Sequence, residues 1–205
     1  MNSVPVRQRQ LVLASGNAGK LAELRALLQP MGVQVQSQGE LGIAGAEEPH
    51  QSFLENALAK ARHAARLSGL PALADDSGLC CRALEGAPGV RSARYAGEHA
   101  SDADNNAFLL QRLAGSAQRD AHFSCVIVAL RHAEDPEPLV ADGRWDGRIL
   151  DAAQGLGGFG YDPLFWLPEL GLTAAQLPPE RKNRLSHRGL AMQALVARLH
   201  ERWQW

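Results

Sequence analysis

The chain has 205 residues, of which 45% are hydrophobic, and this suits one domain with a sizeable core. A formal net charge of -1 and only 5% aromatic residues argue against a nucleic-acid partner, so a nucleotide site would have to be local. The three cysteines include no Cys-x-x-Cys pair, which argues against a disulfide framework or a zinc ribbon. No run approaches the roughly 20 apolar residues of a membrane span, and MNSVPVRQRQ at the start has no apolar signal region. We therefore expect a cytoplasmic protein with no membrane partner.

The first half of the chain predicts strands alternating with helices. Leucines at three-to-four-residue spacing support the first helix, and Ser52 followed by Glu55 resembles a capping box at the start of the second. Ser101 is expected to cap the third. In chain order we expect a strand over residues 10–15, a helix over 18–29, a strand around Val33 and Val35, a loop over 36–50, a helix over 51–68, short strands over 71–75 and 79–84, a turn over 86–89 and a helix over 101–114.

The second half predicts an antiparallel pair of strands. Residues 121–130 have the strongest strand pattern, the turn HAEDPEP follows, and residues 139–149 supply the partner strand. Cys125 lies in the apolar run FSCVIVAL and is expected to be a core thiol. A loop over 154–163 and a last helix over about 187–202 complete the chain. This order indicates a mixed α/β (α+β) fold with a mixed sheet, in a single domain over residues 1–205.

The segment SGNAGKLAEL leads from the first strand into the first helix. A Gly-rich turn at this place aims backbone N–H groups and the positive end of the helix dipole at one point, which suits a phosphate. Lys20 adds a mobile charge and Ser15 a hydroxyl group. The segment is not a Walker loop, because Leu21 follows Gly19-Lys20 and the earlier glycine is too near. A tight turn with a solvated lysine explains these residues equally well.

Two adjacent carboxylates occur in the segment ALADDSGL. On a strand, Asp75 and Asp76 point to opposite faces and therefore do different jobs. One carboxylate would hold Mg²⁺ while the other anchors the turn. The alternative is an Asx-type turn, Asp-Asp-Ser-Gly, at a strand end.

The segment GGFGYDPLF combines glycines with aromatic rings. Its glycines leave room for a planar ligand, and Phe159 and Tyr161 are candidates to stack on a base. Asp162 is a candidate to accept a hydrogen bond from a ring N–H. An ordinary loop also explains the glycines.

The segment ERKNRLSHRGL carries five cationic or potentially cationic side chains in eight positions. Ser186 is expected to cap the last helix, which places His187 and Arg188 in its first turn. The helix dipole disfavours cations there, so their presence indicates an anion or a carbonyl-rich ligand. A solvated basic surface is the alternative.

The segment GAEEPHQSFLENALAKA offers acidic and basic groups. Glu47 and Glu48 are loop carboxylates that would complete a Mg²⁺ site with an aspartate. Asn56 and Lys60 share a helical face by their four-residue spacing, although Lys60 is equally explained as an exposed lysine.

Further along, GAPGVRSARYAG carries Arg91 and Arg94, either structural or at an interface. Among the remaining histidines no pair has metal-ligand spacing, so a zinc site is not expected. The chain also lacks a Gly-x-Ser-x-Gly elbow, which argues against a serine hydrolase of that type.

The order of these motifs is more specific than any one of them. SGNAGK, SFLENALAKA, ALADDSG, GAPGVRSARYAG, GGFGYDP and KNRLSHR, in this order over about residues 10 to 200, resemble the inosine triphosphatase family, and its bacterial members most. The resemblance implies hydrolysis of dITP/ITP and XTP to the monophosphate and pyrophosphate. It also implies an elongated two-lobed fold with the site in a cleft, Mg²⁺ as cofactor and a homodimer.

The resemblance also implies a set of site residues. Asp76 falls on the metal-linked general base, Ser77 and Lys60 on substrate contacts, and Glu47 on the acidic metal ligand. The phosphate loop falls on Ser15, Gly16, Asn17, Ala18, Gly19 and Lys20, and the base-side residues on Phe159, Gly160, Tyr161, Asp162, Lys182, His187 and Arg188.

Departures from the family pattern and rival readings remain. Pro49-His50 follows the acidic pair where Thr-Gly is expected, which leaves the choice between Glu47 and Glu48 open. A Maf-like pyrophosphatase acting on other nucleotides is a rival enzyme, disfavoured by KNRLSHR. A module that binds nucleotide without cleaving it is disfavoured by the adjacent carboxylates.

Overall fold

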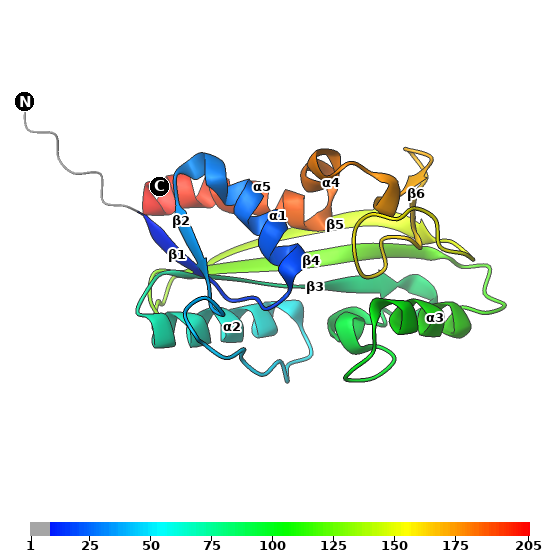
Figure 1. Ribbon diagram of the computed structural model, residues 1–205, viewed down its shortest axis with the longest axis horizontal. Coiled ribbons are helices and arrows are strands. Elements are labelled where there is room, and N and C mark those ends of the chain that lie inside the picture. Colours follow the sequence, from blue (N-terminus) through cyan, green and yellow to red (C-terminus); the bar gives the residue numbers. More distant parts are fainter. Residues whose placement is uncertain (1–8) are drawn as a thin grey trace, which may run out of the picture.

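The computed structural model describes residues 9–205 and is built on one seven-stranded sheet (Figure 1). Its strands are β1 (Gln10–Leu13), β2 (Gln34–Ser37), β3 (Ala72–Cys81), β4 (Asp120–Leu130), β5 (Leu139–Ile149), β6 (Phe165–Leu167) and β7 (Leu172–Thr173). They are ordered β2-β1-β3-β4-β5-β6-β7, with β1 parallel to β2 and β3 and the other pairs antiparallel. The predicted mixed sheet is confirmed. The N-terminal stretch for which no signal region is expected lies largely outside the described residues.

Helices cover both faces of the sheet. They are α1 (Ala18–Leu28), α2 (Phe53–Ser68), α3 (Asp102–Arg112), α4 (Pro179–Leu185) and α5 (His187–Arg198). Helices α1, α4 and α5 lie on one side, and α2 and α3 lie on the other (Figure 1). The expected caps form, because the side chains of Ser52, Ser101 and Ser186 each accept a backbone N–H in the first turn of α2, α3 and α5. No helix within residues 9–205 has the length and apolar character needed to cross a membrane.

The molecule is elongated because β3, β4 and β5 run along most of its length (Figure 1). Separate groups of buried side chains fill its two ends. One group packs α1 and α5 on the sheet, a second packs α3 near β5 and β6, and an alanine-rich face of α2 forms a third with β3. Cys125 belongs to the first group and is fully buried, as predicted.

Strand β3 differs from the prediction. We expected two short strands over 71–75 and 79–84, with an Asx-type turn at Asp-Asp-Ser-Gly as the alternative explanation of the motif, but β3 is one strand from Ala72 to Cys81. Gly78 explains this, because a Cβ atom there would lie 2.3 Å from the carbonyl oxygen of Gly89 and 2.4 Å from Ser92 Oγ. The glycine serves a close approach between segments rather than a turn, so Asp75 and Asp76 lie within the strand.

The C-terminal part also holds elements that the sequence pattern did not reveal. Strands β6 and β7 are short, and α4 begins with Pro179 in its first turn, where a missing N–H does no harm. The last helix ends at Arg198 and continues as a π-helical turn over Leu199–Trp203. Four short 3-10 helices lie at Gln29–Met31, Arg82–Leu84, Gly89–Arg94 and Ala174–Gln176.

Candidate active site

Asp75 is the point where three distant parts of the chain meet. Its Oδ2 atom lies 3.2 Å from Lys20 Nζ, which comes from the start of α1. The same oxygen lies 3.3 Å from Arg188 Nη2, which comes from the first turn of α5. Asp75 is 1% exposed and Arg188 is 2% exposed. The glycine-rich loop, the aspartate pair and the basic C-terminal segment therefore converge on one buried carboxylate.

The charge of Asp75 is held by its cationic neighbours. Burial alone would raise the pKa of this carboxyl, but Lys20 and Arg188 outweigh it and hold the pKa well below its usual range. The second oxygen, Oδ1, is buried and has no hydrogen-bond partner among residues 9–205. Asp75 is thus an ionised group that joins α1 and α5 to the sheet.

Asp76 faces the other side of the sheet. Its Oδ1 lies 3.2 Å from Lys60 Nζ, and its Oδ2 accepts a hydrogen bond of 3.2 Å from Asn56 Nδ2, both on α2. Lys60 also lies 3.1 Å from Glu48 Oε1. The alternation predicted for the two aspartates is confirmed. The open question about Lys60 is answered too, since it is only 8% exposed.

Asp76 and Lys60 shift each other's protonation. Burial is the main influence on Asp76 and raises the pKa of its carboxyl despite the opposing charges of Lys60 and Lys20. Burial would lower the pKa of Lys60, but Asp76, Asp75 and Glu48 together raise it. A carboxyl group with a raised pKa beside a permanently charged lysine is suited to accept a proton.

The glycine-rich loop forms the N-terminal end of α1. Asn17 is the N-cap, and its Oδ1 accepts a hydrogen bond of 3.0 Å from the backbone N–H of Lys20. Ser15 Oγ in turn accepts one of 3.3 Å from the backbone N–H of Asn17. A Cβ atom on Gly16 would meet nothing within 4 Å, so the loop is open at that point. The geometry matches an anion site at a helix N-terminus.

The basic segment lies against α1 and the 154–163 loop. Lys182 Nζ lies 2.7 Å from Asp162 Oδ2 and 3.1 Å from Glu23 Oε1. Arg188 also pairs with Glu23 and donates a hydrogen bond of 3.0 Å to Ser77 Oγ. Protein carboxylates, Glu23 and Asp75, offset the charge of Arg188 in the first turn of α5, and the bound anion or carbonyl-rich ligand that the sequence analysis expected there stays a prediction.

Phe159 packs between these groups. Lys182 Nζ lies 4.5 Å from the centre of its ring and Arg188 Cζ 5.8 Å. A Cβ atom on Gly19 would lie 2.9 Å from the ring, so the glycine allows Phe159 to approach the phosphate loop. The 154–163 loop is held in this position because Asp162 Oδ2 accepts the backbone N–H of Phe159 at 2.9 Å.

The family model described as the Ham1 family matches residues 11–198.

The chain belongs to the Ham1 family.

Relatives of this Ham1 protein cover almost its whole length. The dITP/XTP pyrophosphatase of Aromatoleum aromaticum is 64% identical over 190 residues, which cover 93% of this chain and 96% of that protein. The dITP/XTP pyrophosphatase of Ralstonia nicotianae is 62% identical over 194 residues, with coverage of 93% and 96%. The family resemblance carried by the six ordered motifs is confirmed.

Solved Ham1 structures share the fold. A HAM1 protein from Coxiella burnetii is 46% identical and superposes with a TM-score of 0.88, covering 95% of this chain and 100% of that one. The nucleoside-triphosphatase / dITP/XTP pyrophosphatase from Mycobacterium abscessus is 41% identical with a TM-score of 0.72, covering 93% and 99%.

Tyr161, one of the predicted base-side residues of this Ham1 protein, is buried in a way that limits its role. Tyr161 is 4% exposed, and its hydroxyl donates a hydrogen bond of 2.8 Å to the carbonyl oxygen of Ser92. The expectation that Tyr161 stacks on a base is therefore wrong for this structure, because the ring belongs to the core beside α3. Gly160 instead shapes the loop with a φ of 60°.

His187 is buried and stacks on Phe123, with ring centres 4.7 Å apart and planes inclined by 12°. Burial, followed by the charges of Arg188 and Lys182, places the pKa of His187 well below its usual value, so the ring is neutral at pH 7. Its Nδ1 atom has no hydrogen-bond partner among residues 9–205. His187 is therefore a neutral imidazole with one buried, unpartnered nitrogen.

The acidic loop of the Ham1 chain brings Glu48, not Glu47, to Lys60. Glu47 is exposed, while Glu48 is half-buried in its contact with Lys60. Within residues 9–205 no group of three or more His, Cys, Asp or Glu side chains is arranged to hold a metal ion. A metal ion at Asp76 would therefore take only one or two protein carboxylates.

Glu23 is the functional residue that the sequence analysis missed. It contacts both Lys182 and Arg188 and so links the two base-side cations to α1. Glu23 lies three residues after Lys20, so the two side chains are neighbours on one face of α1. This spacing is the sequence feature from which a role for Glu23 near the phosphate loop could have been predicted.

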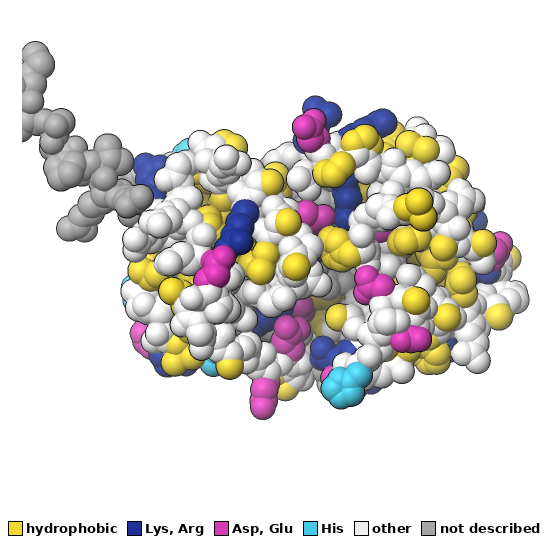
Figure 2. Space-filling model, viewed as in Figure 1, with side chains coloured by type: hydrophobic (Ala, Val, Ile, Leu, Met, Phe, Trp, Pro, Cys, Tyr) yellow, Lys and Arg dark blue, Asp and Glu magenta, His cyan; other side chains and the backbone are white. Residues whose placement is uncertain are grey.

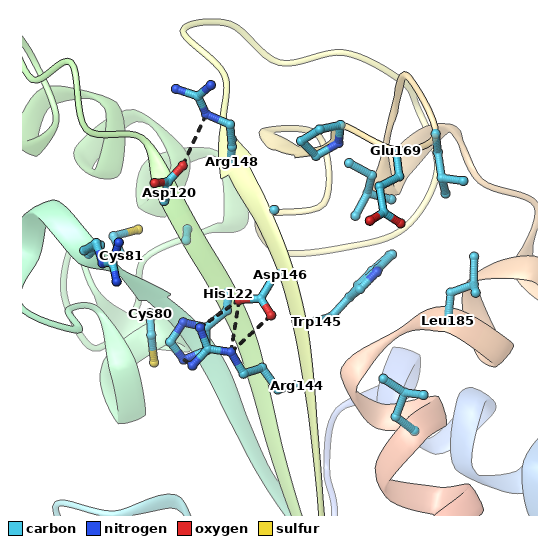
Figure 3. Close-up of a pocket in the computed structure, with 17 residues that line it drawn as sticks. Cys80, Cys81, Asp120, His122, Arg144, Trp145, Asp146, Arg148, Glu169 and Leu185 are labelled. Atoms are coloured by element: carbon cyan, nitrogen blue, oxygen red, sulfur yellow. Dashed lines mark hydrogen bonds and ion pairs between the residues drawn. The ribbon is translucent and has the colours of Figure 1, made fainter.

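Figure 2 shows acidic and basic side chains in a hollow midway along the molecule. A separate cavity of about 920 Å³ lies elsewhere and shares no lining residue with the candidate active site (Figure 3). Trp145 and Leu185 line it, and Arg144 pairs with Asp146 at 2.7 Å. None of the predicted site residues lines this cavity, so we do not take it as the catalytic centre.

Proposed function

We propose that this Ham1 protein hydrolyses non-standard purine nucleoside triphosphates, dITP/ITP and XTP/dXTP, to the nucleoside monophosphate and pyrophosphate, and thereby cleanses the nucleotide pool. The observation that carries the proposal is the meeting of three predicted motifs at Asp75, where Lys20 and Arg188 lie 3.2 and 3.3 Å from one carboxylate oxygen. The names of the relatives, dITP/XTP pyrophosphatase, support the same activity.

In this proposal Asp76 is the general base. A water oxygen attacks the α-phosphorus and gives its proton to the Asp76 carboxylate. The bond from the α-phosphorus to the bridging oxygen breaks, and pyrophosphate leaves. The raised pKa of Asp76 supports this role, because a base whose pKa approaches the working pH transfers protons more effectively.

Cationic groups on two sides would bind the polyphosphate. Lys20 and Lys60 now lie 3.2 Å from Asp75 and Asp76, respectively, and each would exchange or share that contact with phosphate oxygens. The backbone N–H groups at the start of α1 add donors for the same charge. Donors fixed before the reaction stabilise the leaving group without reorganisation.

We propose Mg²⁺ as the metal ion, held by Asp76 and Glu47. Hard carboxylate oxygens suit Mg²⁺, which keeps several waters and binds through one or two carboxylates plus substrate phosphates. This fits a site in which residues 9–205 offer no cage of three protein ligands. Glu48 is already paired with Lys60, which leaves exposed Glu47 as the free carboxylate of the acidic loop. When bound, the ion would neutralise phosphate charge and lower the pKa of a bound water.

Lys182, Arg188 and the free nitrogen of His187 would read the base. Hypoxanthine and xanthine present a carbonyl at C6, where adenine presents an amine. Two cationic donors match the carbonyl, and the amine would leave buried donors unpaired. The ring of Phe159, next to Lys182 and Arg188, supplies a surface on which a base can stack.

We also propose a homodimer. Leu185 and Leu190 are exposed large hydrophobic side chains that line the 920 Å³ cavity, where Arg and Asp side chains alternate along β5 (Figure 3). Such a surface carries both signs of charge and is able to pair with its own copy. Light scattering after size exclusion tests the mass, and a monomer at micromolar concentration refutes the dimer.

The activity is tested with a panel of dITP, ITP, XTP, dATP and dGTP, measuring pyrophosphate, inorganic phosphate and monophosphate separately. In ¹⁸O-labelled water the label is expected in the monophosphate, because attack is on the α-phosphorus. Release of inorganic phosphate, or equal rates with dITP and dATP, contradicts the proposal.

A further inference from the structure

A cavity lined by arginines adjoins the candidate active site. It has a volume of about 770 Å³ and lies between the loop around Glu48, the 3-10 helix Gly89–Arg94 and α3. Three arginines, two glutamates and two aromatic rings line it: Arg91, Arg94, Arg112, Glu48, Glu98, Tyr95 and Phe108. Glu48 belongs to both places, because it lines the cavity and its carboxylate lies 3.1 Å from Lys60 Nζ. The cavity is therefore a direct neighbour of Lys60.

The arginines are only partly neutralised. Arg94 lies between the cavity and the site, with Nη2 donating a hydrogen bond of 3.4 Å to the carbonyl oxygen of Glu48 and Nε 3.6 Å from Glu98 Oε1. Within residues 9–205 the guanidinium groups of Arg91 and Arg112 have neither an ion pair nor a hydrogen bond, although the backbone N–H of Arg91 donates to the carbonyl oxygen of Pro88 at 3.1 Å. Two free guanidinium groups beside one cavity favour an anion with several oxygens.

Tyr95 adds a buried donor without an acceptor. Its ring packs edge-on against Phe108 at 4.9 Å, and its hydroxyl is buried with no hydrogen-bond partner among residues 9–205. Burial raises the pKa of this hydroxyl while Arg112 opposes the shift, so the charge of Arg112 acts on it. Buried hydroxyl groups normally find a partner, and a phosphate oxygen would supply one.

The frame that carries these groups is rigid. Ser92 Oγ accepts a hydrogen bond of 2.9 Å from the backbone N–H of Leu79 in β3 and donates one of 2.6 Å to the carbonyl oxygen of Gly89. Buried Asn105 in α3 accepts the backbone N–H of Ala96 at 2.8 Å and donates to the carbonyl oxygen of Ala93 at 3.1 Å. The arginine segment is thereby fixed to the same strand that carries Asp76.

We propose that this cavity is a binding site for the pyrophosphate product, which moves there from Lys60 as it leaves the catalytic centre. The inference rests on the proposed function. It assigns Arg91, Arg94 and Arg112 to the diphosphate and Tyr95 to one of its oxygens. A highly charged product leaves a partly buried site more readily when a neighbouring cationic site receives it.

The test is calorimetric titration of inorganic pyrophosphate into the full chain. The catalytic centre is first saturated with the α,β-imido analogue of ITP, so that only a second site is free. Wild type is expected to bind further pyrophosphate, and inorganic phosphate, which spans fewer arginines, more weakly. The variant Arg91→Gln/Arg112→Gln is expected to bind pyrophosphate at least about tenfold more weakly.

Two further variants make the test specific. Arg66→Gln/Arg198→Gln removes the same two charges from exposed positions outside the cavity and is expected to bind pyrophosphate as wild type does. Tyr95→Phe removes a hydroxyl that no described residue needs and is expected to weaken binding by a few-fold, about threefold. Unchanged affinity in the Arg91→Gln/Arg112→Gln protein, an equal loss in the control, or no binding beside the bound analogue overturns the proposal. Failure of the proposed function is distinct, because it shows as absent pyrophosphate release from dITP.

Discussion

Asp75 and Asp76 stand next to each other on β3, and the two faces of the sheet give them different surroundings. On the face of α1 and α5, Asp75 is enclosed by Lys20 and Arg188, and its pKa lies well below the usual range. On the face of α2, Asp76 meets Lys60 and Asn56, and burial raises its pKa. The alternation of a strand thus separates a permanently ionised structural carboxylate from one that is able to exchange a proton.

Strand β3 thus carries one aspartate that stabilises the fold and one that is proposed to take part in the chemistry. Replacing Asp75 removes the carboxylate that joins α1 and α5 to the sheet, so we expect the free energy of unfolding to fall. Replacing Asp76 removes the proposed proton acceptor, so we expect turnover to fall. The variants below test this division.

Asp76→Asn is expected to give the largest effect, a fall in turnover of about 10²- to 10⁴-fold, because the amide cannot accept the water proton. Pyrophosphate release from dITP measures it. The wild-type rate is expected to rise with pH through the raised pKa of Asp76, and the variant is expected to lose this limb. Circular dichroism should show an intact fold. A nearly wild-type rate removes Asp76 from the mechanism.

Asp75→Asn is expected to lower the free energy of unfolding by about 3–5 kcal/mol, because Lys20 and Arg188 lose a buried partner. Urea denaturation at pH 7 measures it. Asp146→Asn is the matched control, because its pair with Arg144 is exposed and is expected to contribute less than about 1 kcal/mol.

The pH dependence of this loss has a definite sign. The pKa of Asp75 is depressed in the folded state, so its stabilisation is fully present above the ordinary value of 3.8 and is lost as the pH falls through the folded-state pKa. The difference between wild type and Asp75→Asn should therefore shrink in acid. The difference should stay constant between pH 7 and about pH 4 and shrink at lower pH; a difference that shrinks already above pH 4, or that has not shrunk by about pH 2, contradicts the ionic role.

Much of this comparison could be predicted from the sequence, because it depends on local patterns. Alternation along the strand separates Asp75 from Asp76, and four-residue spacing puts Asn56 and Lys60 on the face of α2 that contacts Asp76. Ser52 marks the start of that helix by its capping bond to the N–H of Glu55.

The rest depends on packing between distant segments, which no local pattern records. The turn chemistry of Asp-Asp-Ser-Gly resembles a strand end, yet Gly78 is needed for the approach of Gly89 and Ser92. Glu23 looks like an ordinary helix-surface glutamate until α4 and α5 bring Lys182 and Arg188 to it. Tyr161 looks exposed in its glycine-rich loop, but its hydroxyl binds the carbonyl oxygen of Ser92.

In the proposed function, base selectivity depends on the Asp75 face of the sheet and should respond to Lys182. Lys182→Met removes a cationic donor for the C6 carbonyl, so the preference for dITP over dATP is expected to fall about 10- to 100-fold. The ratio of kcat/KM for the two nucleotides measures it. Arg181→Gln removes the neighbouring exposed charge from the same helix and should leave the ratio unchanged. An equal loss of rate with both nucleotides assigns Lys182 to folding instead.

In the proposed function, metal affinity depends on the Asp76 face, and the affinity for Mg²⁺ should separate Glu47 from Glu48. Glu47→Gln is expected to raise the Mg²⁺ concentration needed for half-maximal activity by about tenfold, because one charged ligand is lost. Glu48→Gln should instead raise the KM for nucleotide, since Glu48 positions Lys60 through its 3.1 Å contact. Magnesium titrations at fixed dITP, and calorimetry of Mg²⁺ with the imido analogue bound, distinguish the two variants. If Glu48→Gln gives the larger magnesium effect, then Glu48 is the ligand and its pair with Lys60 opens when nucleotide binds.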